Sequence, residues 1–477
     1  MNSILIGRKK EQEVLQKALQ SKEAEMISVI GRRRVGKTFL IKSVYQERIV
    51  FEMSGIQHAP RTEQLRNFAN RLAEVATNAL LIKPPPDWLE AFFLLITYLK
   101  QLKQDEKICV FFDELPWMAT HKSGFLRGLS FFWNSWAVNQ NIVVVICGSA
   151  ASWMIDKVIR HKGGLHNRVT KRIHLKPFSL AETKEYLQQR NIYFNHYQLI
   201  QLYMAMGGVP HYLKEIESGK SAVQNIDAIC FSEDGLLHDE FLSLYPALFG
   251  HADYHIEMIR ALASVQKGMS RTEIVAKIKL PDGGKITKVL SELEQSGFIS
   301  AYRPFGKKKK NKLYRLTDEY SLFYLRFIEN NMQEGESIWQ VLSQTQSWKS
   351  WSGYAFENIC LKHLPQIKKA LGISGVYSIS ASFLKKGNQD EAGVQIDLII
   401  DRNDHIINLF EIKFYNTQFT VTKAYAVKLR EKIKVFQEVT KTRKQIFLSL
   451  ISTFGLKHNI HSLGLITNDL DMDVLFE

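Results

Sequence analysis

Eight consecutive residues near the N-terminus have the types and spacing that bind the phosphates of a nucleotide. They fit the phosphate-loop pattern G-x-x-x-x-G-K-[ST] in full: Gly31, Arg32, Arg33, Arg34, Val35, Gly36, Lys37 and Thr38. The glycines let backbone N–H groups wrap a β-phosphate, and the N-terminus of a following helix adds favourable partial charge. We expect Lys37 to reach the β- and γ-phosphates of ATP and Thr38 to ligate Mg²⁺. The plainer alternative is a chance pattern in a basic loop.

A second set of polar residues follows two apolar runs farther along the chain. Asp113 and Glu114 come directly after the run 108–112, and Ser149 follows the run 142–147. Since α/β sheets bind ligands at the carboxyl ends of their strands, we expect these side chains near the phosphate loop. Asp113 would hold Mg²⁺ through water, and Glu114 would orient and deprotonate the attacking water. Ser149 is placed to bond the γ-phosphate or the water, although a serine here is also an ordinary turn residue.

Three acidic residues and a lysine form a third candidate site near the C-terminus. Asp397 lies in an apolar run, and the pattern Glu411-x-Lys413 begins fourteen residues later. Strand alternation puts Glu411 and Lys413 on one face, and a hairpin about residues 402–405 would bring Asp397 beside Glu411. Two carboxylates would then hold Mg²⁺ or Mn²⁺, and the lysine would position or activate water. Glu357, on an amphipathic helix predicted at 354–364, would supply a further carboxylate. The alternatives are an ordinary ion pair and a degenerate fold kept for DNA binding.

A basic hairpin tip and the helix before it carry candidate residues for contact with DNA. The tip reads GKKKKNK, and the lysines concerned are Lys285, Lys288, Lys307, Lys308, Lys309, Lys310 and Lys312. Lysines at a tip neutralise phosphates without reading base sequence, and those near the start of a recognition helix make groove or backbone contacts. The plainer alternative is that lysines simply cover a solvated surface.

The elements that must position these residues differ along the chain. In the first 178 residues, apolar runs alternate with amphipathic stretches, which predicts a parallel sheet covered on both faces. A capping box at Ser179 and Glu182 opens a helical region that we interpret as a lid. Helical spacing of apolar residues and two strand-like runs around the basic tip outline a winged helix over 251–316, a module that also serves in protein interactions.

Composition and charge limit the class of protein. The 477 residues are 45% hydrophobic and 23% charged, which is ordinary for a globular chain. Lys and Arg outnumber Asp and Glu by 63 to 48, and the net charge of +15 points to a polyanionic partner, nucleic acid first and an anionic membrane second. DNA is the expected nucleic acid, and RNA stays an open alternative. Four scattered cysteines exclude a disulfide framework. Without a signal core or an apolar run of about 20 residues, we expect a soluble, cytoplasmic protein with no membrane segment.

Several motifs, taken in order, resemble the archaeal-type ATPase family of P-loop proteins, which is close to the AAA+ and STAND ATPases. They are IGR, GRRRVGKT, FFDELPWM, CGSAASWM, HNRVTKRIHLKPFSLAE and GGVPHYL, and they cover roughly residues 1–215. The resemblance implies that Gly7 and Arg8 lie near the adenine, that Arg168 or Arg172 senses the γ-phosphate, and that the chain forms a homo-oligomer. It also implies that the architecture continues into a winged helix and a nuclease-like domain.

The C-terminal set resembles the restriction-endonuclease-like PD-(D/E)xK superfamily, which implies a metal-dependent deoxyribonuclease. Ile396 rather than proline precedes Asp397, a departure that many members tolerate. The predicted fold class is therefore multidomain α/β, with five segments. They are a P-loop ATPase core at 1–178, a helical lid at 179–250, a winged helix at 251–316, a helical connector at 317–345 and a restriction-endonuclease-like domain at 346–477.

These motifs together predict an ATP-hydrolysing, DNA-binding protein whose nuclease-like domain cleaves DNA under the control of ATP. Defence against foreign DNA is a setting that the resemblance alone suggests. The alternative is an ATP-dependent switch that binds DNA or a protein partner without cutting. The nuclease and the switch differ in one structural requirement. In a nuclease, the C-terminal carboxylates and lysine must converge on one metal-sized point.

Overall fold

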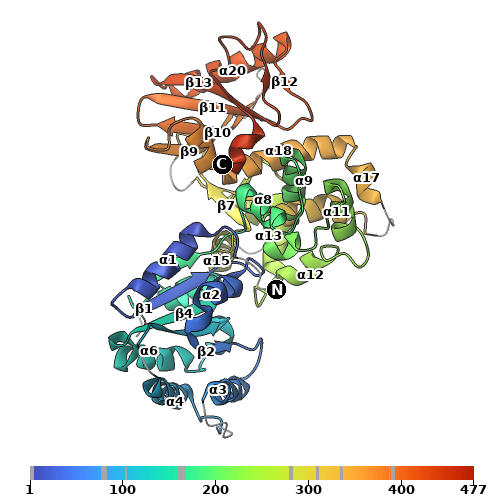
Figure 1. Ribbon diagram of the computed structural model, residues 1–477. Helices are drawn as coiled ribbons and strands as arrows, with labels where there is room; N and C mark the ends of the chain where they lie inside the picture. The colour runs from blue at the N-terminus through green and yellow to red at the C-terminus, as the bar shows by residue number, and fades with distance from the viewer. Residues whose placement is uncertain are drawn as a thin grey trace. The chain divides into compact units, whose positions relative to one another are not determined.

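The chain folds into two compact units, the first formed by residues 1–177 with 295–297 and the second by 178–294 with 298–477 (Figure 1). The computed structural model describes residues 5–76, 83–102, 105–149, 151–159, 165, 167–278, 283–307, 311–332, 337–385, 387 and 393–477. No helix in these ranges combines the length and the hydropathy that crossing a membrane requires.

The first unit is built on a sheet of five parallel strands, in the order β2-β3-β4-β1-β5. The strands are β1 (Glu25–Ile30), β2 (Ile49–Ser54), β3 (Ile108–Asp113), β4 (Ile142–Gly148) and β5 (Lys171–His174). Because all of them run the same way, their carboxyl ends share one edge of the sheet, and β4 lies between β1 and β3. The predicted parallel sheet is confirmed. The polar edge strand β5 is an addition that the apolar runs did not indicate.

Helices bury both faces of this sheet, as the continuous apolar strands predict. Those over one face are α1 (Lys9–Gln20) and α2 (Lys37–Tyr45), and those over the other are α3 (Arg61–Val75), α4 (Trp88–Gln101) and α6 (Phe125–Ser135). In β3, Cys109 and Phe111 pack toward α1 and α2, whereas Val110 and Phe112 pack toward the other three helices. Shorter turns are η1 (Gln46–Arg48), α5 (Leu115–Met118), η2 (Ala137–Asn139), α7 (Ala151–Met154) and η3 (Ile155–Ile159).

The second unit begins with the helices predicted as a lid. They are α8 (Leu180–Gln188), α9 (His196–Met206), α10 (Pro210–Leu213), α11 (Ala222–Cys230) and α12 (Glu240–Leu244). The capping box at the start of α8 is present, because the N–H of Glu182 donates to Ser179 Oγ at 3.2 Å and the N–H of Ser179 donates to Glu182 Oε2 at 2.9 Å. Gly207 ends α9 with a left-handed φ of 64°, a conformation that favours glycine.

Three helices and a small antiparallel sheet follow in the order expected for 251–316. They are α13 (Asp253–Ala263), β6 (Met269–Ser270), α14 (Arg271–Ile278), α15 (Gly284–Gln295), β7 (Ile299–Tyr302) and β8 (Leu313–Leu316). The sheet order is β6-β8-β7. Residues predicted at helical spacing, such as Ile259, Leu262 and Leu293, are buried. The assignment of this segment to a winged helix stays a prediction.

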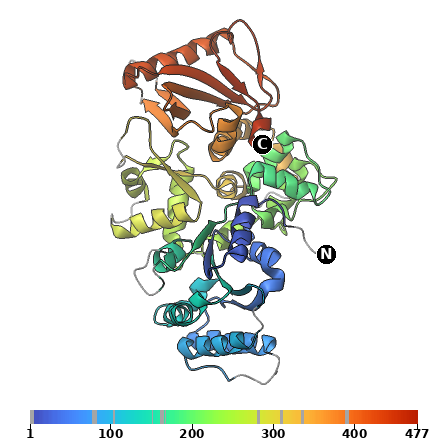
Figure 2. The same ribbon diagram turned by 60° about the vertical axis from the view of Figure 1, so that its left-hand side comes forward.

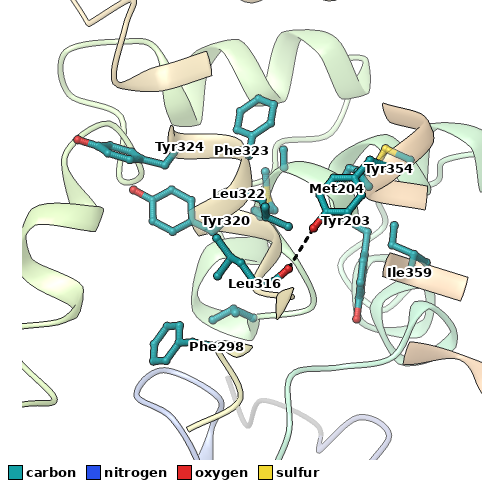
Figure 3. Packing of buried hydrophobic residues seen from close by; sticks show 14 of the residues in the cluster. Tyr203, Met204, Phe298, Leu316, Tyr320, Leu322, Phe323, Tyr324, Tyr354 and Ile359 are labelled. Atoms are coloured by element: carbon teal, nitrogen blue, oxygen red, sulfur yellow. Dashed lines mark hydrogen bonds between the residues drawn. The ribbon is translucent and has the colours of Figure 1, made fainter. Parts of the chain in front are cut away.

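One hydrophobic core runs through the second unit (Figure 3). It includes Tyr203 of α9, Phe298 beside β7, Tyr320 of the connector and Tyr354 of a later helix. The Tyr354 hydroxyl donates to the carbonyl of Leu316 at 3.5 Å. The connector consists of α16 (Glu319–Phe323), η4 (Tyr324–Ile328) and α17 (Ile338–Leu342). The lid helices, the connector and α18 therefore pack together within the second unit.

A mixed five-stranded sheet forms the C-terminal part of this unit, in the order β15-β13-β11-β10-β9. The strands are β9 (Ser378–Lys385), β10 (Val394–Arg402), β11 (Ile406–Lys413), β13 (Gln445–Ser452) and β15 (Asn468–Leu470). Strands β9, β10 and β11 pair antiparallel, whereas β11, β13 and β15 pair parallel. The long helix α20 (Lys423–Thr440) packs on one face (Figure 2).

The helix on the other face of this sheet, α18 (Gln346–Lys362), differs from the predicted helix at 354–364. It begins eight residues earlier because Thr345 caps it, its hydroxyl accepting from the N–H of Trp348 at 3.3 Å. It also ends earlier, since Leu364 starts a separate short helix with Pro365 in its first turn. The remaining elements are α19 (Leu364–Ala370), β12 (Phe419–Thr420), β14 (Leu456–Lys457) and η5 (Met472–Phe476).

Candidate functional site

The predicted phosphate loop lies between the end of β1 and the start of α2. Gly36 has a left-handed φ of 90° directly before α2, and Gly31 lies so close to the backbone that a Cβ there would be 2.3 Å from the carbonyl oxygen of Leu175. Both positions therefore require glycine. The ammonium of Lys37 is buried and donates to the carbonyls of Gly31 at 2.9 Å and Arg32 at 3.0 Å. The side chain of Lys37 thus folds back onto the backbone of its own loop.

The other loop residues contribute in different ways. Arg32 and Val35 are buried, Arg33 is exposed, and Arg34 has a left-handed φ of 70°. The three arginines of the loop therefore differ in exposure and in backbone conformation.

Thr38 and Asp113 meet at the carboxyl edge of the sheet. The Thr38 hydroxyl donates to Asp113 Oδ2 at 2.6 Å, although the two residues are 75 positions apart. A hydroxyl and a carboxylate are the oxygen ligands that Mg²⁺ prefers, so the residues present fit the predicted cation. The structure therefore brings together two parts of the site that the sequence placed in separate motifs.

Glu114 and Ser149 form a second contact at the same edge. Ser149 donates from its hydroxyl at 2.8 Å and from its backbone N–H at 3.2 Å to Glu114 Oε2. Glu114 has a left-handed φ of 46° just after β3, which turns the chain into α5. Ser149 was predicted to bond the γ-phosphate or the water, whereas in the structure it bonds the predicted base.

The segment implied to lie near the adenine packs on the phosphate loop. Arg8 is buried and donates from Nη2 to the carbonyl of Val35 at 3.3 Å, and the side chain of Gln12 donates to the carbonyl of Gly7 at 2.6 Å. The two candidate sensors, Arg168 and Arg172, are both exposed, and Arg172 lies within the edge strand β5. The structure does not choose between these arginines.

In the second unit, Glu411 is surrounded by positive charge. Its carboxylate forms ion pairs with Lys413 and Lys432, each at 2.7 Å, and accepts a hydrogen bond from the Tyr425 hydroxyl. Burial would raise the pKa of Glu411, but the two ammonium groups lower it to about 2, so the group is ionised at neutral pH. Burial likewise opposes the charge of Lys413, but Glu411 holds the pKa of that lysine above its ordinary value.

Glu357 on α18 differs from Glu411 because its pKa is raised rather than lowered. Burial raises its pKa to about 8, the Asp397 carboxylate adds to the rise, and Arg315 and Lys413 oppose it. Arg315 Nη2 lies 4.0 Å from Glu357 Oε2, and Asp397 accepts a hydrogen bond from the side chain of Gln395. The four predicted residues therefore share one electrostatic neighbourhood.

The strand register agrees with the predicted hairpin. Leu398 pairs with Phe410, so Asp397 and Glu411 are the next residues toward the open end of β10 and β11. Among the residues that the structure describes, however, no group of three or more His, Cys, Asp or Glu side chains could hold a metal ion. The geometry therefore offers an ion-paired Glu411 beside Asp397 rather than a three-acid metal cluster.

The predicted DNA-contacting lysines lie on exposed surface or outside the described part of the chain. Lys307 and Lys312 are exposed on either side of the tip, and Lys308, Lys309 and Lys310 lie outside the described residues. Lys285 has its ammonium 3.4 Å from the centroid of the Tyr254 ring, and Lys288 lies 3.7 Å from Glu292.

Three residues of the C-terminal neighbourhood were missed by sequence reasoning: Arg315, Tyr425 and Lys432. Arg315 is only 6% exposed in its side chain, and it comes from the small sheet rather than from the C-terminal segment. Tyr425 and Lys432 lie seven residues apart on one face of α20, a spacing that the sequence shows but that signals a helix face rather than a partner.

Comparisons with known proteins bear on the first unit and on part of the second. Residues 5–216 match the family described as an ATPase domain predominantly from Archaea. An uncharacterized protein of Methanocaldococcus jannaschii, MJECL04, is 25% identical over 416 residues, which cover 86% of this chain and 88% of that protein.

Two solved structures are similar to this chain at low sequence identity. The Walker-type ATPase PABY2304 of Pyrococcus abyssi has a TM-score of 0.49 and 17% identity, and the match covers 68% of this chain and 96% of that one. The ORC2 protein of Aeropyrum pernix has a TM-score of 0.40 and 16% identity, over 70% of this chain and 96% of that one. Residues 5–216, less than half of the chain, are thus similar to an ATPase domain described as predominantly from Archaea.

Proposed function

We propose that this chain hydrolyses ATP at the phosphate loop and uses the nucleotide state to control DNA binding by its second unit. The observation that carries the proposal is the 2.6 Å contact between Thr38 and Asp113, which joins the two halves of a nucleotide site. Lys37 would neutralise charge on the β- and γ-phosphates. Glu114 would take the proton of the attacking water, since a carboxylate within reach of water is a competent general base.

Mg²⁺ belongs to this proposal as the cation that neutralises phosphate charge. Thr38 and Asp113 would hold it through their side-chain oxygen atoms. Ser149 would keep Glu114 in place through the two hydrogen bonds that it donates.

The experiment that tests this proposal compares ATP binding and phosphate release in the parent and in Glu114→Gln. We expect the variant to bind ATP with parental affinity and to hydrolyse it about 100-fold more slowly or worse, because shape is kept while the base is lost. Glu63→Gln, an exposed position on α3, is the matched control and should behave as the parent does. Parental turnover in Glu114→Gln would remove Glu114 from the role of base.

DNA is the partner that the charge of the chain supports best. The net charge is +15, and Lys307 and Lys312 are exposed at the tip between β7 and β8. The order of elements from α13 to β8 supports a winged helix, a module that places a helix and a wing against nucleic acid. Binding of a protein partner by the same surface is the alternative.

A second candidate function is metal-dependent DNA cleavage in the C-terminal part. It is favoured by the shared neighbourhood of Glu357, Asp397, Glu411 and Lys413 and disfavoured by the absence of a three-acid cluster in the described residues. Cleavage of plasmid and linear DNA with Mg²⁺ or Mn²⁺ decides it, with Lys413→Ala as the test variant and the exposed Lys423→Ala as its control. DNA cleavage that is lost in Lys413→Ala and retained in Lys423→Ala supports a nuclease. No cutting, with DNA binding intact, supports a non-cleaving switch.

A further inference from the structure

The second unit contains a cavity of about 250 Å³ that neither the ATPase site nor the proposed wing contacts explain. Its walls come from β7 and β8, from α18, and from β9 and β10. The two sheets meet beside it, since the N–H of Phe305 donates to the carbonyl of Ser382 at 2.7 Å. The cavity is therefore lined by elements of one compact unit.

The lining combines apolar surface with charged side chains. Leu361, Phe383 and Leu398 contribute apolar surface, whereas the charged side chains are those of Lys267, Arg315, Lys362 and Asp397. A ligand that fits must therefore carry an apolar body and a polar or anionic group.

Arg315 is held in the wall by several contacts. Its Nε donates to the carbonyl of Gln266 at 3.1 Å, and its guanidinium lies 5.9 Å from the ring centroid of Tyr302 and 5.2 Å from that of Tyr354. A guanidinium fixed in this way is preorganised for a phosphate, because its donors need little further ordering. Tyr302 also lines the cavity and adds an aromatic surface.

Size limits the ligand further. The cavity is smaller than the roughly 300–1,000 Å³ typical of pockets for drug-sized molecules. A double helix, whose major groove alone is about 12 Å wide, cannot enter it. One base with its sugar matches both the volume and the mixed chemistry of the walls.

We propose that this cavity binds a single unstacked nucleotide, with its base against the apolar wall and Tyr302 and its phosphate toward Arg315. The inference rests on the DNA-binding part of the proposed function and names the form of nucleic acid that the second unit prefers, a single strand or a frayed end. Because Asp397 lies in the same wall, a nucleotide held there brings its phosphodiester to the C-terminal carboxylates. The shared ligand chemistry is a nucleotide, and its source is either a strand or a free nucleotide.

The experiment measures fluorescence anisotropy with the full chain in EDTA, where metal-dependent cutting does not occur. The probes are a labelled deoxythymidine decanucleotide and a blunt duplex of equal length, and thymidine monophosphate is the competitor. Ser380→Phe fills the cavity from β9, because Ser380 pairs with Ile400 on the face of the sheet that α18 covers. Ile379→Phe, on the opposite face of the same strand and outside the lining, is the matched control. Tyr302→Leu removes the aromatic surface while keeping an apolar side chain, and circular dichroism verifies the fold of each variant.

We expect Ser380→Phe to weaken single-strand binding at least about tenfold and Tyr302→Leu to weaken it about fivefold or more, with duplex binding and the control unchanged. Competition by thymidine monophosphate that Ser380→Phe abolishes, without an effect on strand binding, supports the free nucleotide as the source. The proposal is overturned if neither strand binding nor this competition responds to Ser380→Phe and Tyr302→Leu. Duplex binding without single-strand binding also overturns it and leaves the proposed DNA function intact, whereas a parent that binds neither probe contradicts that function itself.

Discussion

Ser149 holds the carboxylate of Glu114 with two donors, its hydroxyl at 2.8 Å and its backbone N–H at 3.2 Å. The contact is possible because β4, which ends at Gly148, lies between β1 and β3 in the sheet. The loop after the middle strand thus reaches the predicted base after β3. Glu114 is therefore fixed by a neighbouring strand rather than by its own.

Removal of the Ser149 hydroxyl should slow catalysis without weakening nucleotide binding. In Ser149→Ala the backbone N–H still donates, but one charge-assisted hydrogen bond, typically worth about 1.5–3 kcal/mol, is lost. We expect kcat for ATP hydrolysis to fall about tenfold while the affinity for ATP stays at the parental value. Ser135→Ala, at an exposed position on α6, is the control for loss of a serine hydroxyl. Unchanged or faster turnover in Ser149→Ala would show that the bond does not position Glu114.

The buried His363 should make the stability of the second unit depend on pH. Its Nε2 accepts from the N–H of Leu180 at 3.1 Å, and its Nδ1 lies 2.8 Å from the carbonyl of Ile359. Burial lowers its pKa from 6.5 to about 4, and Lys362 adds to the decrease. The unfolded chain therefore binds a proton at a higher pH than the folded chain does. The stabilisation is complete above pH 6.5 and falls by roughly 3 kcal/mol as the pH drops through the window to about 4.

The measurement is denaturant unfolding of the full chain between pH 4 and 7.5. His363→Phe should lose stability at pH 7, because the N–H of Leu180 loses its acceptor, and should show a flatter decline toward low pH. The exposed His121→Gln in the first unit should keep the parental slope. Equal pH slopes in the parent and in His363→Phe would contradict a buried neutral imidazole.

The lysines at the hairpin tip should set the salt dependence of DNA binding. Each phosphate contact contributes about 0.9 to the slope of log K against log salt for duplex DNA. We expect Lys307→Ala with Lys312→Ala to lower the magnitude of that slope by nearly 2, measured by anisotropy between 50 and 200 mM salt. Substitution of the exposed Lys423 and Lys428 on α20 is the control. If the double substitution leaves the salt slope of DNA binding unchanged, these lysines do not contact DNA phosphates.

The predicted ATPase site could be found from the sequence because each of its motifs is one short stretch of the chain. The glycines and lysine of the phosphate loop stand together, and Asp113 ends a strand whose burial its own apolar run predicts. The meeting of Thr38 with Asp113 follows from the parallel sheet. The contact of Ser149 with Glu114 could not be predicted, because it depends on a strand order that apolar runs do not encode.

The C-terminal neighbourhood was harder to predict because its partners come from distant segments. Arg315 reaches Glu357 from another sheet, and Lys432 reaches Glu411 from α20. Edge strands were missed for a related reason. Only Ile173 is buried in β5 and only Phe383 in β9, so neither strand shows the continuous apolar run of a central strand.

Hydrolysis of ATP at the phosphate loop is tested most directly by measuring phosphate release from ATP. The proteins compared are the parent and Lys37→Ala. The buried ammonium of Lys37 already lies inside the loop, 2.9 Å from the carbonyl of Gly31, where it would neutralise phosphate charge. We expect Mg²⁺-dependent hydrolysis by the parent and a hydrolysis rate at least about 100-fold lower in Lys37→Ala. Hydrolysis by Lys37→Ala at the parental rate would contradict hydrolysis at the phosphate loop.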